Sequence, residues 1–199
     1  MLVTPGKSRT FQRKLYAKAK PDPGYRYYVL SDKVYRGDVL QHTSRLVRSS
    51  KGALGRDGVS FEAIEAGEGG EAFLERVAEE VKHKTYRPMP VDIPTIRDRV
   101  GQMAVKLMSE PIFEADCCEC SYGFRPKRSA HDAMGAISYA LHKGPTEVMD
   151  ADLSKYVDPL PHAKVLAVVA ERIAECGLWP LIKQWLKAPV VEKGADGKD

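Results

Sequence analysis

The chain has 199 residues, of which 43% are hydrophobic and 29% charged, the balance of a soluble globular protein. No apolar run approaches the roughly 18 to 20 residues of a membrane span, so we expect no membrane partner. The N-terminus lacks the apolar stretch of a secretory signal, which favours an intracellular, cytoplasmic location.

The net charge of +4 is unevenly distributed along the chain. Residues 1–51 contain twelve Lys and Arg but only three Asp, a net charge of +9, and the remainder therefore carries about −5. A basic N-terminal region favours a polyanionic partner, and nucleic acid is the first candidate. The alternative is a helical surface that is charged only to remain soluble.

The segment "SRTFQRKLYAKAK" predicts an amphipathic helix near the N-terminus. Phe11, Leu15 and Ala19 are four residues apart and form one apolar stripe, whereas Lys and Arg occupy the other face. The sequence "PDPG" follows and ends this helix.

Two further helices are predicted in "YRYYVLSDKVYRGDVLQHTSRLVRSS". Asp38 is expected to be the N-cap of the second one. The side chains expected to face inward from it are Leu40, Thr43 and Val47. Glycine-rich loops follow, and "EAFLERVAEEVKHK" then predicts a helix with an apolar side formed by Phe73, Val77 and Val81.

A proline-rich stretch precedes the longest predicted helix. The segment "YRPMPVDIP" must be extended, because three prolines in nine residues exclude a helix. Thr95 then begins a helix, with Asp98 three residues later in a capping-box arrangement. Its apolar stripe contains Ile96, Val100, Ala104 and Leu107.

The last third of the chain contains one strand candidate among helices. Ser129 and Asp132 are expected to cap a helix that follows "CSYGFRPKRS". The segment "TEVMDAD" is the best strand candidate, and helices are expected at about 161–175 and 178–187.

The four cysteines do not form a disulfide framework. Cys117, Cys118 and Cys120 are crowded as C-C-x-C, and Cys176 is separate. A structural zinc site normally has two paired ligand clusters, and the sequence has no second pair. We therefore expect buried free thiols in a reducing compartment.

Five blocks follow one another along the chain: "LYAKAK" with "LSDKVYRGDVL"; "KGALGRDGVSFEAIE"; "TYRPMPV" with "IPTIRDRVGQMAVKLMSEPIFEADCCECSYGFRPKRSAHDAM"; "DADLSKYVDPLPH"; and "LIKQWLKAPV". In this order they resemble the N-terminal part of group II intron-encoded reverse transcriptases, or maturases. The resemblance covers nearly the whole chain. It implies an α+β fold with a basic helical N-terminal extension (1–85), a fingers region (86–145) and a partial palm with motif A (146–199). The palm is expected to be incomplete, because a whole palm needs at least three antiparallel strands.

By resemblance, Asp152 is the catalytic carboxylate of motif A that binds Mg²⁺, and Leu153 offers its carbonyl oxygen to a metal. Nucleotidyl transfer uses two divalent metals that hold the attacking and leaving oxygens, and Mg²⁺ prefers oxygen ligands. The family's other carboxylates come from a Tyr-x-Asp-Asp hairpin, and this sequence contains no Asp-Asp pair. We therefore expect an incomplete site and a chain that does not polymerise alone. Without the flanking blocks, the favoured interpretation of Asp150 and Asp152 would be structural: two acidic residues that form turns at the end of a strand.

Two further positions depart from the family pattern. Val91 is followed at once by Asp92, where the family has a hairpin that binds the triphosphate, which indicates an internal deletion near 91–92. Val157 occupies the nucleotide-binding position at which an aromatic ring packs under the sugar. Valine there predicts relaxed sugar selection in a complete enzyme, or drift in a sequence no longer selected for catalysis.

RNA contacts are expected from two basic clusters. Arg97 and Arg99 follow "IPT", and Arg125, Lys127 and Arg128 lie in "GFRPKRS", regions that by resemblance line the fingers and the template path. Such phosphate contacts are strong but not sequence-specific. The alternative is that these arginines pair with nearby acids, such as Asp98, Glu114 and Asp116.

The leading interpretation is a fragment of an RNA-directed DNA polymerase that binds intron or template RNA and is inactive alone. One alternative is a non-catalytic, RNA-binding maturase-like module that assists the folding of its intron. Another is one half of a split reverse transcriptase, completed by a palm and thumb fragment.

Overall fold

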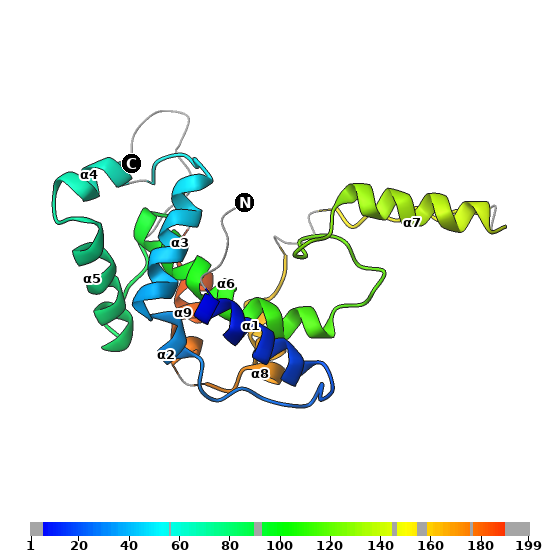
Figure 1. The fold of residues 1–199 in the computed structure, drawn as a ribbon, viewed down its shortest axis with the longest axis horizontal. Coiled ribbons are helices and arrows are strands. Elements are labelled where there is room, and N and C mark those ends of the chain that lie inside the picture. Colours follow the sequence, from blue (N-terminus) through cyan, green and yellow to red (C-terminus); the bar gives the residue numbers. More distant parts are fainter. Residues whose placement is uncertain are drawn as a thin grey trace.

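A computed structural model describes residues 6–55, 57–89, 93–144, 147–154, 159–175 and 177–189. Within these ranges the chain is rich in helices and almost without strands. The β-type pairing found there is one isolated parallel bridge between Tyr27 and Ile173. Figure 1 shows the helix α7 (Ala130–His142) projecting away from a body formed by the other helices.

The centre of the body is the long helix α6 (Ile96–Asp116). It begins as predicted, because the Thr95 hydroxyl accepts a hydrogen bond from the Asp98 backbone N–H at 3.2 Å. The predicted apolar stripe is buried and contains Ile96, Val100, Ala104 and Leu107. Neighbouring helices therefore pack along this stripe, as Figure 1 illustrates for α1 and α3.

A proline inside α6 explains one of its contacts with α1 (Gly6–Ala19). Pro111 has no backbone N–H, so the carbonyl of Leu107, four residues earlier, lacks its usual helical donor. The side chain of Gln12 on α1 donates to that carbonyl at 2.9 Å. The stripe predicted for α1 is turned toward the core and contains Phe11, Leu15 and Ala19.

The helix α3 (Gly37–Ser49) packs against α6 as well. Its predicted inward side chains are buried: Leu40, Thr43 and Val47. The predicted N-cap is wrong, because the cap residue is Arg36 and Asp38 lies in the first turn. The Asp38 carboxylate instead accepts hydrogen bonds from the Arg36 guanidinium at 2.8 Å and the Ser8 hydroxyl at 3.2 Å.

The remaining helices are α2 (Ser31–Val34), α4 (Phe61–Ala66), α5 (Gly70–Lys82), α8 (His162–Arg172) and α9 (Leu178–Lys187). The last two match the helices expected at about 161–175 and 178–187. The predicted apolar side of α5 faces the core and contains Phe73, Val77 and Val81.

Arg172 ties the C-terminal helices to the body. Its guanidinium is buried, donates to the Ala19 carbonyl at 3.1 Å and pairs with Asp116 at 2.9 Å. The parallel bridge lies beside it, where the Tyr27 N–H donates to the Arg172 carbonyl at 2.8 Å. The contacts of Arg172 with Ala19 and with Tyr27 join residues that are about 150 positions apart, so the end of α8 is fixed against the end of α1.

The helix α7 begins with the predicted capping box. The Ser129 hydroxyl accepts from the Asp132 N–H at 3.2 Å, and the Asp132 carboxylate accepts from the Ser129 N–H at 2.9 Å. None of the residues of α7 is buried. The helix is therefore started by local hydrogen bonds but is not covered by the body.

The expected α+β class is not confirmed among the described residues. The strand predicted for "TEVMDAD" is absent from 147–154, which form neither helix nor strand. A strand requires a neighbouring backbone as hydrogen-bond partner, and here the side chain of Met149 is 94% exposed. The palm sheet is thus not formed in this part of the chain. No helix in the described ranges is long and apolar enough to cross a membrane.

Candidate RNA-binding surface

The predicted metal position lies in the exposed stretch 147–154. Asp152 and Leu153 are both exposed there, and Val157 lies outside the described residues. Among the residues that are described, no three His, Cys, Asp or Glu side chains are close enough to hold a metal ion. Because Mg²⁺ requires several oxygen ligands in octahedral geometry, the described donors around Asp152 are too few to hold the ion by themselves.

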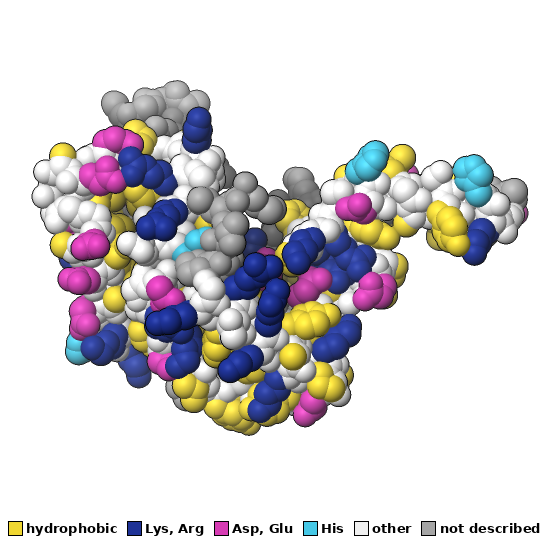
Figure 2. All heavy atoms as spheres, in the orientation of Figure 1, with side chains coloured by type: hydrophobic (Ala, Val, Ile, Leu, Met, Phe, Trp, Pro, Cys, Tyr) yellow, Lys and Arg dark blue, Asp and Glu magenta, His cyan; other side chains and the backbone are white. Residues whose placement is uncertain are grey.

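The helix α1 has a basic, solvent-exposed face. Five cations and no acids occupy this helix, and all five side chains are exposed: Lys7, Arg9, Arg13, Lys14 and Lys18. Figure 2 shows Lys and Arg side chains gathered over the part of the surface where Figure 1 places α1. Within the described ranges, the ion pairs with carboxylates are made by other residues, so this face keeps its positive charge.

The anchoring of α1 gives these cations a rigid support. Leu15 and Ala19 are buried on the opposite side of the helix, and Gln12 is bonded to α6. At the end of the helix, the Lys20 ammonium donates to the Ala115 carbonyl at 3.2 Å. This last contact brings the end of α1 to the end of α6, where the loop 117–129 begins.

Arg125 holds the loop 117–129 together from within. Its side chain is only 7% exposed and pairs with Glu114 at 2.7 Å, as the alternative to RNA contact had suggested. The same guanidinium donates to the carbonyls of Cys118 and Ser121. The Glu114 partner raises the pKa of Arg125, so this arginine is charged and already neutralised by the protein.

Lys127 and Arg128 lie nearer to the solvent. Arg128 pairs with Glu119 at 2.6 Å and packs over the ring of Tyr122, whereas Lys127 is exposed, in a backbone conformation with φ of +60°. Arg128 is the main cause of the lowered pKa of the Glu119 carboxyl, and Lys20 contributes as well. The loop and the end of α1 are therefore close enough to share one electrostatic field.

The second predicted cluster, on α6, is engaged with protein groups. Arg97 pairs with Glu80 at 3.0 Å and lies over the ring of Tyr86, and Arg99 donates to the Ala53 carbonyl at 2.5 Å. Contact with a phosphate would require these guanidinium groups to exchange or share their present partners. RNA binding by Arg97 and Arg99 therefore stays a prediction.

A buried polar network lies beneath Arg97 and contains Asp98, whose carboxylate is 3.9 Å from the Arg97 guanidinium, as the alternative to RNA contact had suggested. The Asp98 carboxylate accepts from the Tyr86 hydroxyl and from the Met89 N–H at 3.3 Å. The Trp185 indole N–H donates to the same hydroxyl at 3.0 Å. Burial raises the pKa of Tyr86, so the hydroxyl stays protonated and joins α6 to α9.

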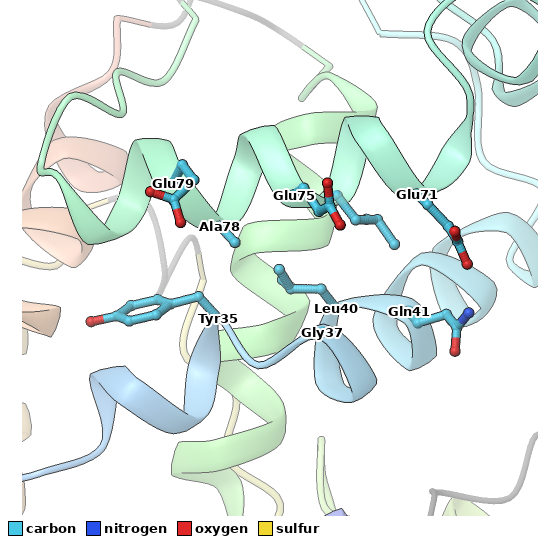
Figure 3. A pocket seen from close by; sticks show the side chains of 9 residues that line it. Tyr35, Gly37, Leu40, Gln41, Glu71, Glu75, Ala78 and Glu79 are labelled. Atoms are coloured by element: carbon cyan, nitrogen blue, oxygen red, sulfur yellow. The ribbon is translucent and has the colours of Figure 1, made fainter.

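An acidic groove separates α3 from α5 on another side of the body. It has a volume of about 560 Å³, and Glu71, Glu75 and Glu79 line it from α5. Figure 3 shows these three carboxylates along α5, facing Tyr35 and Leu40. Carboxylates repel phosphate, so this groove is unsuited to a nucleic-acid backbone.

The cysteines differ from the sequence-based expectation. Cys118 and Cys120 are exposed and Cys117 is half-buried, so the expected burial of these thiols is wrong. They lie in the loop 117–129, outside the helical core, because the apolar stripe of α6 ends before them. Cys176 lies outside the described residues.

Sequence reasoning recognised the charge of the N-terminal region but no individual cation of α1. The signal was present, because the predicted helix contains five Lys and Arg and no acid. The predicted clusters instead followed the motifs that the resemblance supplied. The structure brings Arg128, through Glu119, near Lys20 at the end of α1 and leaves Asp152 and Leu153 on the stretch 147–154, which has neither helix nor strand.

Comparison with known proteins identifies the relatives of the chain, although no protein-family model matches it. Protein YkfC of Escherichia coli (strain K12) is 32% identical over an alignment of 204 residues in length. The alignment covers 92% of this chain and 53% of YkfC. Group II intron-encoded protein LtrA of Lactococcus lactis subsp. cremoris is 28% identical over 186 residues, 84% of this chain and 29% of LtrA. Nuclear intron maturase 2 of Arabidopsis thaliana is 30% identical over 115 residues, 57% of this chain and 15% of the maturase.

The chain thus spans about half the length of YkfC and less than a third of LtrA. The intron-encoded proteins and the maturase match it over half of its residues or more. The chain belongs among the group II intron reverse transcriptase and maturase-like proteins.

Proposed function

We propose that this chain is a maturase-like RNA-binding protein that contacts the phosphate backbone of an intron RNA through the basic face of α1. The observation that carries the proposal is the set of five exposed cations on a helix without acids. The names of the relatives supply the class of partner, because LtrA is intron-encoded and the Arabidopsis protein is an intron maturase.

Charge and rigidity together favour this surface. Each Lys or Arg that neutralises a phosphate releases condensed counterions, which drives binding and makes it dependent on salt. The buried side of α1 fixes the helix axis, so binding orders only side chains rather than the backbone. The acidic groove beside α5 has the opposite charge and supports an orientation in which it faces away from RNA.

The loop 117–129 extends the proposed surface. Lys127 is exposed, and Arg128 can turn from Glu119 toward a phosphate without disturbing the core, because Glu119 is itself exposed. Arg125 is better suited to hold the loop, since its guanidinium is buried against Glu114. We keep Arg97 and Arg99 as secondary contacts that must exchange or share protein partners.

RNA-directed DNA polymerase activity is a separate proposal that follows from the family. Asp152 and Leu153 would contribute one carboxylate and one carbonyl oxygen to Mg²⁺, and Val157 would lie under the sugar of a nucleotide. The chain has no Asp-Asp pair, so the missing carboxylates would have to come from a complementing palm and thumb fragment. The proposed extension (1–85) and fingers (86–145) share one core, because α1 and α3 pack on α6.

The test is filter binding of the chain to a structured group II intron RNA across a salt series. In the test variant, Arg9, Arg13 and Lys14 are replaced by Ala. We expect an affinity loss of about tenfold or more at low salt and a salt slope smaller by up to about three units.

A control variant removes the same charge from cations that already have carboxylate partners. It replaces Lys33, Arg48 and Lys82, which pair with Asp32, Glu65 and Glu79, and its affinity is expected to change by less than about twofold, since paired cations release few counterions. Equal losses in the two variants would contradict the proposal. Circular dichroism melts verify that both variants are folded.

A further inference from the structure

Two exposed thiols lie side by side in the loop 117–129. The sulfur atoms of Cys118 and Cys120 are 3.0 Å apart, within hydrogen-bond range for sulfur. Both residues are exposed, and both thiols are free. The RNA-binding proposal makes no use of them.

The local backbone explains why the two side chains meet. Cys117 ends α6, and the Ser121 N–H then donates to the Cys118 carbonyl at 3.1 Å, which closes a turn with Cys118 first and Cys120 third. Arg125 and Arg128 donate to the carbonyls of this turn. The turn is therefore held from both sides, and the two sulfurs are kept together before any bond forms.

We propose that Cys118 and Cys120 form a redox-modification site that closes to an intramolecular disulfide by exchange with a small-molecule disulfide. A metal site is less consistent with the geometry, because the described residues bring no third thiol, imidazole or carboxylate into reach. Two thiols in contact and open to solvent are what thiol–disulfide exchange requires. The proposal does not depend on RNA binding.

The two thiols have different roles in the exchange. The hydrogen bond from Cys120 stabilises the thiolate of Cys118 and lowers the pKa of that thiol. Cys118 is therefore the attacking group, because the thiolate is the nucleophile. Cys120 keeps its proton longer, since its pKa is raised by the same contact, and acts second.

The reaction balances in two steps. The Cys118 thiolate attacks one sulfur of the small disulfide, whose S–S bond breaks and releases one small thiol that takes up the Cys118 proton. Cys120 then loses its proton and attacks the Cys118 sulfur, which forms the protein disulfide and releases the second small thiol. The two cysteines lose two electrons and two protons together, and the small disulfide gains both.

The experiment uses the full chain with Cys117 and Cys176 replaced by Ser, which leaves only the proposed pair. After incubation with glutathione disulfide, remaining thiols are alkylated and the intact mass is measured. We expect the loss of two hydrogen atoms, no glutathione adduct, and full reversal by dithiothreitol. The proposal would be overturned if both cysteines stayed reduced and were alkylated, or if the protein kept a stable glutathione adduct.

Single-thiol variants supply the controls. With Cys120 also replaced by Ser, Cys118 is expected to keep a glutathione adduct, because no second thiol can release it. A variant that retains only the half-buried Cys117 is expected to react about tenfold more slowly than one that retains only Cys118. Equal rates at Cys117 and Cys118 would contradict the assigned roles. Circular dichroism melts verify that each variant is folded.

Discussion

Two neighbouring helices, α6 and α7, begin alike and end in different surroundings. Both have side-chain N-caps, from Thr95 and from Ser129 with Asp132. Yet α6 is covered by α1 and α3, whereas α7 has no buried residue and projects from the body (Figure 1). Local capping therefore starts a helix, whereas its burial depends on partners from elsewhere in the chain.

The same contrast separates the two proposed activities. The cations of α1 are carried by the packed body, whose core includes Leu15, Val100 and Ile112. The predicted catalytic Asp152 follows α7 in an exposed stretch without helix or strand. We therefore expect RNA binding to be a property of the body that survives changes in α7.

The largest expected effect is in the core. Replacing Ile112 by Ala removes a side chain that is 0% exposed in the C-terminal part of α6, and the cavity should lower the free energy of unfolding by about 2 to 5 kcal/mol. Denaturant unfolding followed by circular dichroism measures this change. A loss below about 1 kcal/mol would mean that the core packs less tightly than described.

A smaller loss is expected when the buried polar network is broken. Replacing Tyr86 by Phe leaves the Asp98 carboxylate and the Trp185 N–H without their shared hydroxyl, which should cost about 1 to 3 kcal/mol. Tyr139 on α7 is 63% exposed, and its replacement by Phe is the matched control. The comparison fails if both substitutions shift the unfolding midpoint equally.

The stability of the body should also depend on pH through His42. Its side chain is buried in α3, and burial, with the nearby Arg45 charge, lowers its pKa from the ordinary value near 6.5. The folded state therefore favours the neutral ring, so the stabilisation is present above about pH 6.5 and is lost as pH falls below it.

Thermal melts at pH 7.5 and pH 5.5 measure this dependence. Both pH values lie above the range in which ordinary carboxylates titrate. We expect a lower Tm at pH 5.5 and a smaller difference after His42 is replaced by Asn. The same replacement of His131, exposed on α7, should leave the difference unchanged. A wild-type Tm that rises on acidification would refute this assignment.

The smallest expected effect is on α7. Ile137 is 51% exposed, so its replacement by Ala should change the free energy of unfolding by no more than about 0.5 kcal/mol. Ile112→Ala is the matched substitution in a buried helix. A large loss at Ile137 would show that α7 is packed against a partner in solution.

The helices and their apolar stripes could be predicted from the sequence, because both depend on spacing within one segment. The stripes of α1, α3 and α6 face the core as expected, and only Phe11 among their predicted residues is partly rather than fully buried. The cap of α3 was mispredicted, since Asp38 is engaged by Ser8 from another helix. Such a contact has no local signal in the sequence.

The strand and the metal site depend on residues that the local sequence does not supply. A strand at 147–154 needs a second backbone beside it, and Asp152 needs further oxygen ligands. From the sequence alone, the basic residues could either contact RNA or pair with nearby acids. Arg125 is paired with Glu114, whereas the cations of α1 lie on a helix that offers no acid to pair with.

Lysine footprinting would show whether RNA lies on α1. The chain is acetylated with and without a structured intron RNA, and modification is measured at each lysine by mass spectrometry. We predict strong protection of Lys7, Lys14 and Lys18 and little change at Lys82, which pairs with Glu79 of the acidic groove. Protection at Lys82 with none on α1 would contradict this prediction.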